Sequence, residues 1–354
     1  MTARNLIPGI ALAVTLAILS AALAATATSL LSGEVKIPVS PIMTAILLGI
    51  LIRNAVALPG AVETGLQFST SRILQAGIVL LGIRLSLADF ATIGLSSLPV
   101  IIVCIGVAIF MVSYFSRRMG LSPQLGSLIA VGTSICGATA IVATAPTISA
   151  REHEVSYAIA CITLFGAIAM LIYPLGAHWL FEGDPRQVGI FLGTAVHDTA
   201  QVTGAGMMYA NLYQSEETLN IATVTKMVRN LSILIVIPLI SITYQRRHMA
   251  TGQSAAMLSL VPLFIIGFAL MSLLRTVGDL GPQAFGILPP EQWHTAVDML
   301  QQTSEICLVV AMAAVGLSTR LKGLQAIGLK PLALGFAAAL SVGAVSFTLV
   351  YLFY

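Results

Sequence analysis

One stretch of the sequence organises the rest: Gly193-Thr194-Ala195-Val196-His197-Asp198-Thr199-Ala200-Gln201-Val202-Thr203-Gly204-Ala205-Gly206. It carries ionisable and amide side chains, although apolar sequence flanks it on both sides. An earlier stretch resembles it: Gly132-Thr133-Ser134-Ile135-Cys136-Gly137-Ala138-Thr139-Ala140-Ile141-Val142-Ala143-Thr144-Ala145. Both begin with Gly-Thr, both consist mainly of small residues, and both lead into a long apolar segment with one proline. We therefore expect the two stretches to form one functional centre.

The composition places this centre in a membrane protein. Of 354 residues, 57% are hydrophobic and 9% are charged, and the mean hydropathy is +0.96. Soluble domains carry about 25% charged residues, so the composition excludes a soluble enzyme. The net charge of +3 is small and indicates no nucleic-acid partner.

The cysteines all lie in apolar runs, with no CxxC pair and no Cys/His cluster. We expect them to be buried and inert, so that the chain has no disulfide, no metal site and no cofactor. The four are Cys104, Cys136, Cys161 and Cys307.

Apolar segments long enough to cross a bilayer follow one another along the chain. The first, 6–31, also fits a cleaved signal peptide, but its length of about 25 residues favours a span. We predict an all-α polytopic membrane protein of about eleven transmembrane helices with internal repeats, in a single domain over 1–354; two broken, crossing helices are added to this fold only by the family resemblance given below. The further spans are 39–58, 70–89, 97–116, 123–149, 153–178, 187–210, 217–244, 256–275, 296–318 and 331–354.

Lysine and arginine indicate the orientation, because short loops rich in them stay in the cytoplasm. With a cytoplasmic N-terminus and an external C-terminus, most basic residues lie at inner ends of spans. The inner set is Arg4, Arg53, Arg72, Arg117, Arg118, Arg186, Arg246, Arg247, Arg320, Lys322 and Lys330, and the outer set is Lys36, Arg84, Arg151 and Arg275.

Internal repeats extend beyond the two Gly-Thr stretches. The segment 81–88 resembles 315–322, and 154–174 parallels 217–238. The orientation makes the first pair inverted, but it gives the spans that begin at 123 and 187 the same direction. The symmetry of the repeat stays open at this point.

His197, Asp198 and Gln201 are the polar residues that packing does not explain. An ionisable group at membrane depth costs roughly 2.5–3.5 kcal/mol even on lenient scales, and usually marks a pathway. His197 and Gln201 share a face if the segment is helical. The alternative is a structural hydrogen-bonded pair of His197 and Asp198.

A second geometry is an interrupted helix, unwound near Gly193 or Gly204. Bare N–H groups at such a break, with the positive end of a half-helix, suit an anion. Thr133 and Ser134 would then supply hydroxyls from the facing stretch, and Thr194 would do so from its own.

Lys226 and Arg229 project from one side of a helix, with Asn230 beyond them. Snorkelling to the interface is the alternative interpretation. A span that began only at Asn230 would reach Tyr244 in about 22 Å, which is too short to cross. We therefore expect a buried cationic site, which favours an anionic substrate.

Three further charged residues give weaker signals. Arg84 lies near a span end and is expected to snorkel. Asp298 and Glu305 lie on one helical face, and either could carry a coupling ion; Glu305 lies within the span, whereas capping explains Asp298 equally well.

The two Gly-Thr stretches, together with Leu81-Gly82-Ile83-Arg84-Leu85 and the segment Lys226-Met227-Val228-Arg229, resemble the YeiH-type family that is labelled as sulfate exporters. The resemblance covers nearly the whole chain, and Asp198 stands where many members carry glutamate. It implies a multi-pass bacterial inner-membrane protein related to the bile-acid:sodium symporter superfamily, with a panel and a core of crossing broken helices.

We therefore expect a secondary transporter of a small anion, coupled to a proton or sodium gradient. The family implies that it is an exporter and that the anion is sulfate or a related sulfur oxyanion. A cation/proton antiporter that uses His197 and Asp198 is the alternative. An enzyme is not expected, because no nucleophile or metal motif accompanies His197 and Asp198.

The expected partners are the substrate, the coupling ion and the lipid bilayer, and whether the protein forms a homo-oligomer stays open. The predicted substrate-binding residues are Thr133, Ser134, Thr194, His197, Gln201, Lys226 and Arg229; the predicted coupling residues are Asp198, His197 and Glu305.

Overall fold

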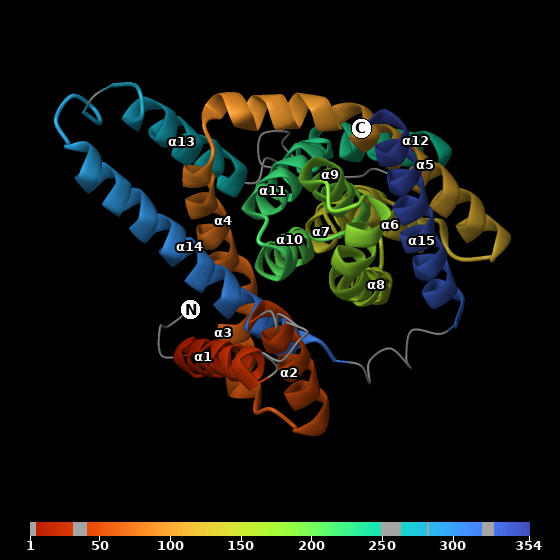
Figure 1. The fold of residues 1–354 in the computed structure, drawn as a ribbon. Helices are drawn as coiled ribbons and strands as arrows, with labels where there is room; N and C mark the ends of the chain where they lie inside the picture. The colour runs from red at the N-terminus through yellow and green to blue at the C-terminus, as the bar shows by residue number, and fades with distance from the viewer. Residues whose placement is uncertain (1–4, 31–40, 249–262, 282, 321–328) are drawn as a thin grey trace. The chain divides into compact units, whose positions relative to one another are not determined.

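The computed structural model describes residues 5–30, 41–248, 263–281, 283–320 and 329–354 (Figure 1). Within these ranges the regular structure is helical, apart from one isolated bridge between Ala284 and Leu288. The chain is a polytopic all-α membrane protein, as predicted. Three predicted orientation markers, Arg4, Lys36 and Lys322, lie outside the described residues.

The chain divides into two compact units, each built from segments that are distant in sequence. Unit 1 comprises Met1–Ile93, Ala210–Gln214 and Pro262–Arg320, and unit 2 comprises Gly94–Tyr209, Ser215–Val261 and Leu321–Tyr354. Two of the boundaries fall within helices, one near the start of α5 (Leu87–Arg118) and one near the end of α10 (Thr199–Tyr213). The prediction of a single domain stays a prediction.

Unit 1 packs a small set of helices around an aliphatic core. Leu16, Leu66 and Leu317 are buried in that core at 3%, 0% and 0% exposure. Its elements are α1 (Ile7–Leu30), α2 (Pro41–Ala55), η2 (Gly60–Val62), α3 (Glu63–Phe68), η3 (Ser69–Ile73), α4 (Leu74–Leu81), η4 (Gly82–Arg84), α13 (Leu263–Gly278) and α14 (Pro290–Ser318).

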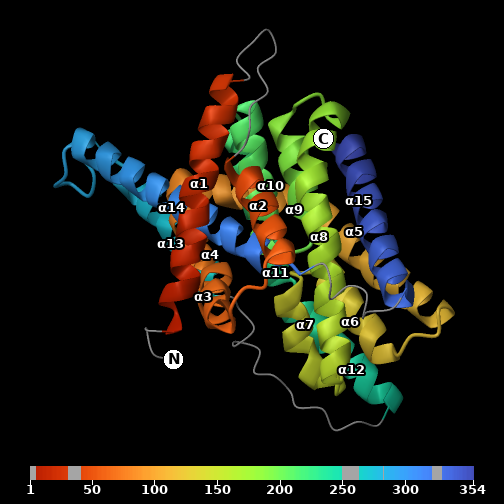
Figure 2. The same ribbon diagram turned by 90° about the horizontal axis from the view of Figure 1, so that it is seen from below.

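Unit 2 contains most of α5 and the helices that carry the two Gly-Thr stretches. Figure 2 shows α15 running beside α8 and α9 in this unit. Its elements are α5 (Leu87–Arg118), α6 (Pro123–Ser134), α7 (Ala138–Thr144), η5 (Ala145–Ile148), α8 (Glu152–Leu180), α9 (Pro185–Ala195), α10 (Thr199–Tyr213), α11 (Glu216–Leu231), α12 (Ile233–His248) and α15 (Leu329–Phe353).

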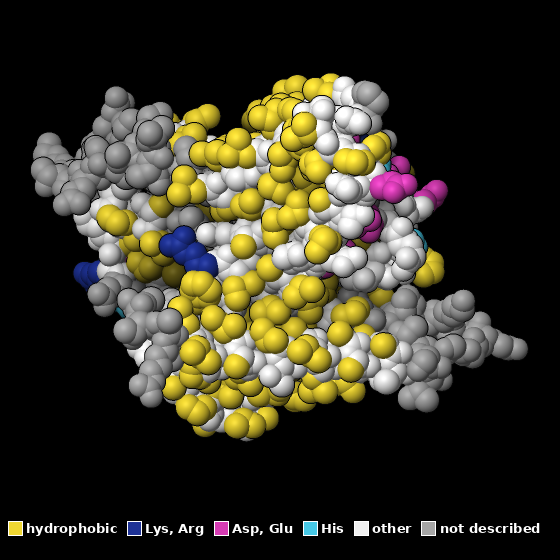
Figure 3. Space-filling model, turned by 90° about the vertical axis from the view of Figure 1, so that its left-hand side faces the viewer, with side chains coloured by type: hydrophobic (Ala, Val, Ile, Leu, Met, Phe, Trp, Pro, Cys, Tyr) yellow, Lys and Arg dark blue, Asp and Glu magenta, His cyan; other side chains and the backbone are white. Residues whose placement is uncertain are grey.

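Seven helical stretches among the described residues have the length and apolarity to cross a membrane. On α5, Leu95, Ile102 and Phe110 are 64–69% exposed and recur on one side of the helix, which suits contact with lipid. Figure 3 shows that apolar side chains cover much of one face of the molecule. The seven are Ile7–Thr26, Gly60–Arg84, Leu87–Arg118, His153–Leu180, Glu216–Ile240, Pro290–Ser318 and Leu329–Phe353; Pro41–Ala55, Ala138–Ile148 and Leu263–Gly278 are shorter apolar helices.

Each predicted span overlaps a described helix, but the number that crosses the bilayer stays a prediction. The span predicted over 70–89 begins earlier, because helical structure runs without a gap from Gly60 to Arg84.

The glycines that the segments 81–88 and 315–322 share, Gly82 and Gly316, both allow close helix packing in unit 1. A Cβ on Gly82 would lie 2.4 Å from the carbonyl oxygen of Phe268 on α13. A Cβ on Gly316 would lie 2.5 Å from the carbonyl oxygen of Ile46 on α2. Both glycines thus allow a neighbouring helix to approach with backbone against backbone.

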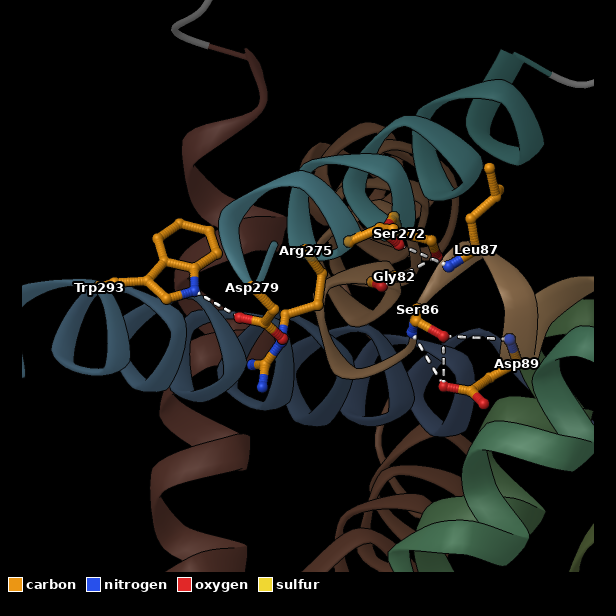
Figure 4. A network of polar contacts seen from close by, with 9 residues as sticks. Gly82, Ser86, Leu87, Asp89, Ser272, Arg275, Asp279 and Trp293 are labelled. Atoms are coloured by element: carbon orange, nitrogen blue, oxygen red, sulfur yellow. Dashed lines mark hydrogen bonds and ion pairs between the residues drawn. The ribbon is translucent and has the colours of Figure 1, made fainter. Parts of the chain in front are cut away.

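A polar network ties α13 to the corner between α4 and α5 (Figure 4). Ser272 donates to the Gly82 carbonyl at 3.0 Å, and the Leu87 N–H donates to Thr276 at 2.8 Å. Ser86 and Asp89 bond to each other at the start of α5, as in a helix N-cap.

A second part of this network lies after the end of α13 (Figure 4). Partial burial acts to raise the pKa of Asp279, but the Trp293 hydrogen bond at 2.7 Å and the Arg275 ion pair at 2.6 Å together hold it below its ordinary value.

Candidate functional site

Both Gly-Thr stretches are interrupted helices, and the interruptions fall at matching positions. α6 ends at Ser134 and α7 begins at Ala138, while α9 ends at Ala195 and α10 begins at Thr199. Residues 135–137 and 196–198 are therefore equivalent when counted from the Gly-Thr pairs. These two breaks belong to unit 2 and lie against each other.

An unwound segment near Gly193 or Gly204 was one of the expected geometries, and the helix is interrupted at 196–198, three residues after Gly193. Gly193 lies inside α9 and Gly204 inside α10. A Cβ on Gly193 would lie 2.6 Å from the Cβ of Thr225, so this glycine lets α11 pack closely against α9.

Gly137 brings the two breaks together. Its φ of 64° lies in the left-handed region, which side chains rarely adopt. A Cβ at this position would lie 2.7 Å from Oδ2 of Asp198. The residue must therefore be glycine both for its backbone conformation and for the space that the carboxylate occupies.

Lys226 of α11 is fully buried and reaches both breaks, so it does not snorkel. Its ammonium donates to the carbonyl oxygens of Ile135 at 2.9 Å and Val196 at 3.3 Å, and also to that of His197. An ammonium has three N–H donors, so these three bonds use its full capacity.

Arg229 is also fully buried and holds the last turns of α6 and α9. Nε donates to the Ser134 carbonyl at 2.8 Å, Nη1 to those of Thr194 at 2.5 Å and Val196 at 3.2 Å, and Nη2 to that of Thr133. Carbonyls at a helix C-terminus lack intrahelical partners and carry the negative end of the dipole. The two cations therefore stabilise both helix ends at once.

Asp198 and Gln201 cap α10. Oδ1 of Asp198 accepts from the Ala200 N–H at 2.9 Å, and the Asp198 N–H donates to Oε1 of Gln201 at 3.2 Å. The carboxylate accepts from the second residue of α10 and the glutamine amide accepts from the N-cap, so the arrangement is a variant of the capping box. Sequence reasoning missed it, although the spacing of three between an N-cap carboxylate and a glutamine is its known signature.

The other end of Gln201 ties the break to α8. Its Nε2 donates to the Thr163 carbonyl at 3.1 Å, and a Cβ on Gly166 would lie 1.9 Å from its Oε1. Both ends of the amide are thus engaged within the protein.

Two of the predicted hydroxyl groups are engaged as well. Thr194 donates to the Ile190 carbonyl at 2.6 Å and bonds Ser346 of α15 at 2.7 Å. Ser134 donates to the Val131 carbonyl of its own helix at 3.3 Å.

Other buried polar atoms at the breaks have no hydrogen-bond partner among the described residues. They include Oγ1 of Thr133 and both ring nitrogens of His197, which are 0% and 1% exposed. On α11, Oγ1 of Thr225 and Oδ1 of Asn230 are also unpartnered. We did not predict the last two as site residues, although they share the helical spacing of Lys226 and Arg229.

The residues at the breaks differ in exposure from the two cations of α11. Asp198 and its neighbour Thr199 are half-buried and Thr139 is exposed, whereas Lys226 and Arg229 are inaccessible. Asp198 is thus the charged residue of the breaks that is partly exposed.

Glu305, the third predicted coupling residue, belongs to unit 1 and not to unit 2. It forms an ion pair with Arg84 at 2.5 Å. The Arg84 side chain is only 4% exposed, so the expected snorkelling is wrong: burial against α14 with a carboxylate partner replaces it. Asp298 is exposed.

Comparison with known proteins gives consistent matches along most of the chain. The family model described as "Conserved hypothetical protein 698" matches residues 8–335. The UPF0324 membrane protein spr0034 of Streptococcus pneumoniae is 37% identical over 278 residues, which cover 78% of this chain and 79% of that protein.

Two further relatives extend the match to other bacteria. The UPF0324 membrane protein FN0533 of Fusobacterium nucleatum is 32% identical over 87% of this chain and 88% of its own. The UPF0324 inner membrane protein YeiH of Salmonella typhi is 30% identical over 84% and 81%. No solved structure matches the chain.

Proposed function

The chain belongs to the UPF0324 family of membrane proteins, as the YeiH-type resemblance predicted, and from that premise we propose that it is a secondary transporter of a small anion. Sulfate or a related sulfur oxyanion is the first substrate to test. A proton or sodium gradient drives the transport in this proposal, and the bacterial inner membrane, with the N-terminus in the cytoplasm, is its location.

The observation that supports this proposal most is the charge imbalance at the two breaks. Lys226 and Arg229 place two basic side chains in a buried region where Asp198 is the carboxylate that interacts with Lys226. The helix-end carbonyls that accept from Lys226 and Arg229 offset part of their charge, but two basic groups face one carboxylate, and a net positive charge in a low-dielectric interior favours an anionic ligand.

The predicted substrate residues divide by their present contacts. Thr133 and His197 have unpartnered polar atoms and are the residues that we propose contact the anion. Ser134, Thr194, Gln201, Lys226 and Arg229 are engaged within the protein, so a direct role for them requires their hydrogen bonds to rearrange.

Flux through proteoliposomes tests the proposal. Protein reconstituted with internal sulfate should exchange it for external radiolabelled sulfate, and thiosulfate, sulfite, acetate and methanesulfonate should compete according to their affinity. A Thr133→Val variant keeps the shape of the side chain and removes the hydroxyl, so we expect weaker binding of the anion in a folded protein. Equal flux in protein-free liposomes would contradict the proposal.

The alternative is a cation/proton antiporter, and the half-buried Asp198 favours it, because an accessible carboxylate is an acceptor for a cation or a proton. That function predicts sodium flux that depends on pH and needs no anion.

A further inference from the structure

Asp198 occupies the position that an incoming anion would take. Its Oδ1 accepts from the Ala200 N–H at 2.9 Å, next to the positive end of α10, and its carboxylate also interacts with the backbone N–H of Ala138. These backbone donors lie beside the half-buried Asp198, whereas the two cations lie fully buried. While Asp198 is charged, it both uses the donors and repels a second anion.

The charged and titratable groups around Asp198 come from every segment that packs against it. Lys226 of α11 and Cys136 of the break between α6 and α7 interact with Asp198, and Arg229 and His197 interact with Lys226 beside it. Neutralising Asp198 therefore leaves two buried cations with no carboxylate near them, and an anion restores the balance.

A second observation at the start of α10 indicates a missing partner there. Asn230 is 1% exposed, and its Nδ2 donates to the Thr199 hydroxyl at 3.0 Å, which directs the amide at the first residue of α10. Its Oδ1 has no hydrogen-bond partner among the described residues. A buried acceptor without a donor implies a ligand, a water molecule or a protonated group at this place.

We infer that the anion and a proton bind together, because the anion takes its place beside α10 only after the Asp198 carboxylate has accepted a proton. The inference rests on the proposed function and specifies its coupling: one proton moves with the anion, in the same direction. The carboxylate gains a proton from water, becomes a neutral acid and releases its hold on the backbone donors.

Binding of radiolabelled sulfate to the purified full-length protein between pH 5 and pH 8 tests this coupling. Where Asp198 releases its proton, linkage of one proton to one anion weakens sulfate binding by up to about tenfold for each pH unit. Asp198→Asn removes the carboxylate charge, and asparagine can still cap a helix. The variant should therefore bind sulfate with the same affinity at every pH. At pH 8 it should bind sulfate more tightly than the wild type.

Asp184→Asn is the matched control. Asp184 caps α9 through a 2.7 Å bond from the Gln187 N–H, but it is exposed and lies away from the breaks. This variant should keep the wild-type dependence on pH. The pH dependence of the wild type and of Asp184→Asn decides the matter even if Asp198→Asn fails to fold, because the inference requires sulfate binding to weaken as the pH rises in both proteins.

The outcomes separate the inference from the proposed function. Sulfate affinity that is flat or rises with pH in the wild type, or a pH dependence that survives in Asp198→Asn, overturns the proton coupling alone. Failure of sulfate, thiosulfate, sulfite, acetate and methanesulfonate to bind at any pH overturns the proposed function. Stabilisation by sodium that grows with pH and is lost in Asp198→Asn overturns the coupling in favour of the antiporter.

Discussion

Lys226 shows how one side chain can hold two helix ends. Replacing it with methionine leaves the carbonyls of Ile135, Val196 and His197 without that donor in a buried place. Each unsatisfied buried group costs about 1–3 kcal/mol, so we expect Lys226→Met to lower the free energy of unfolding by about 3 kcal/mol or more. Lys330→Met is the control, because Lys330 is exposed at the start of α15.

The measurement for this pair is the midpoint of thermal unfolding in detergent. Lys226→Met should melt well below the wild type, and Lys330→Met should melt close to it. A normal midpoint together with lost anion binding would instead indicate that Lys226 acts on the substrate and contributes little to the breaks.

Gly137 gives a second test at the scale of one residue. Gly137→Ala places a methyl group 2.7 Å from Asp198 in a left-handed backbone conformation, which costs of the order of 1–3 kcal/mol. Gly106→Ala in α5 is the control, because a Cβ there meets nothing within 4 Å and alanine favours a helix. Thermal unfolding should rank Gly106→Ala at or above the wild type and Gly137→Ala below it; the reverse order would show that the breaks do not touch as described.

At the scale of the element, the two broken helices depend on α8 and α11 for their geometry. α11 supplies the cations to both C-terminal ends, and α8 receives the Gln201 amide at the Thr163 carbonyl. Neither broken helix therefore holds its shape through its own sequence alone, which explains why the spacing of glycines did not locate the breaks.

Gly166 and Gln201 should be energetically coupled. Gly166→Ala forces the Gln201 amide out of place and weakens its bonds to Asp198 and Thr163. Gln201→Ala removes the amide and opens the space that the new methyl group needs. We expect Gly166→Ala to be clearly destabilising in the wild type and much less so in the Gln201→Ala background.

A double-mutant cycle measures this coupling from four unfolding midpoints. Residues in contact show interaction energies of about 0.5–3 kcal/mol. Strictly additive effects of the two substitutions would mean that Gln201 does not rest against Gly166.

At the scale of the whole molecule, periodic and compositional signals predicted the fold class and the place of the helices. A membrane-spanning helix is recognisable from its local composition, because contact with lipid requires a long apolar segment. The predicted spans 97–116 and 153–178 accordingly correspond to α5 and α8. The division into two units was not predicted, because it depends on contacts between segments that are distant in sequence, such as α2 with α14.

The site was predictable in its residue types but not in its contacts. Charges within apolar sequence directed attention to Lys226, Arg229 and Asp198, because burial of charge is costly wherever it occurs. Their partners are backbone carbonyls and amides, which every residue carries, so the sequence holds no signal for which of them a lysine or an arginine meets.

The basic residues predict an orientation of the molecule, which can be tested directly. Arg118 ends α5, and Arg151 precedes α8; both are exposed, and the predicted span over 123–149 lies between them. With a cytoplasmic N-terminus, Arg118 lies inside and Arg151 lies outside.

In a background where the half-buried Cys307 is replaced by serine, Arg151→Cys should react with a membrane-impermeant maleimide on intact cells. Arg118→Cys should react only after the cells are permeabilised. The parent protein without either new cysteine supplies the baseline, because its remaining cysteines are buried. Labelling with the sides exchanged would place the N-terminus outside, and labelling of both positions from one side would mean that the segment containing α6 and α7 does not cross the membrane.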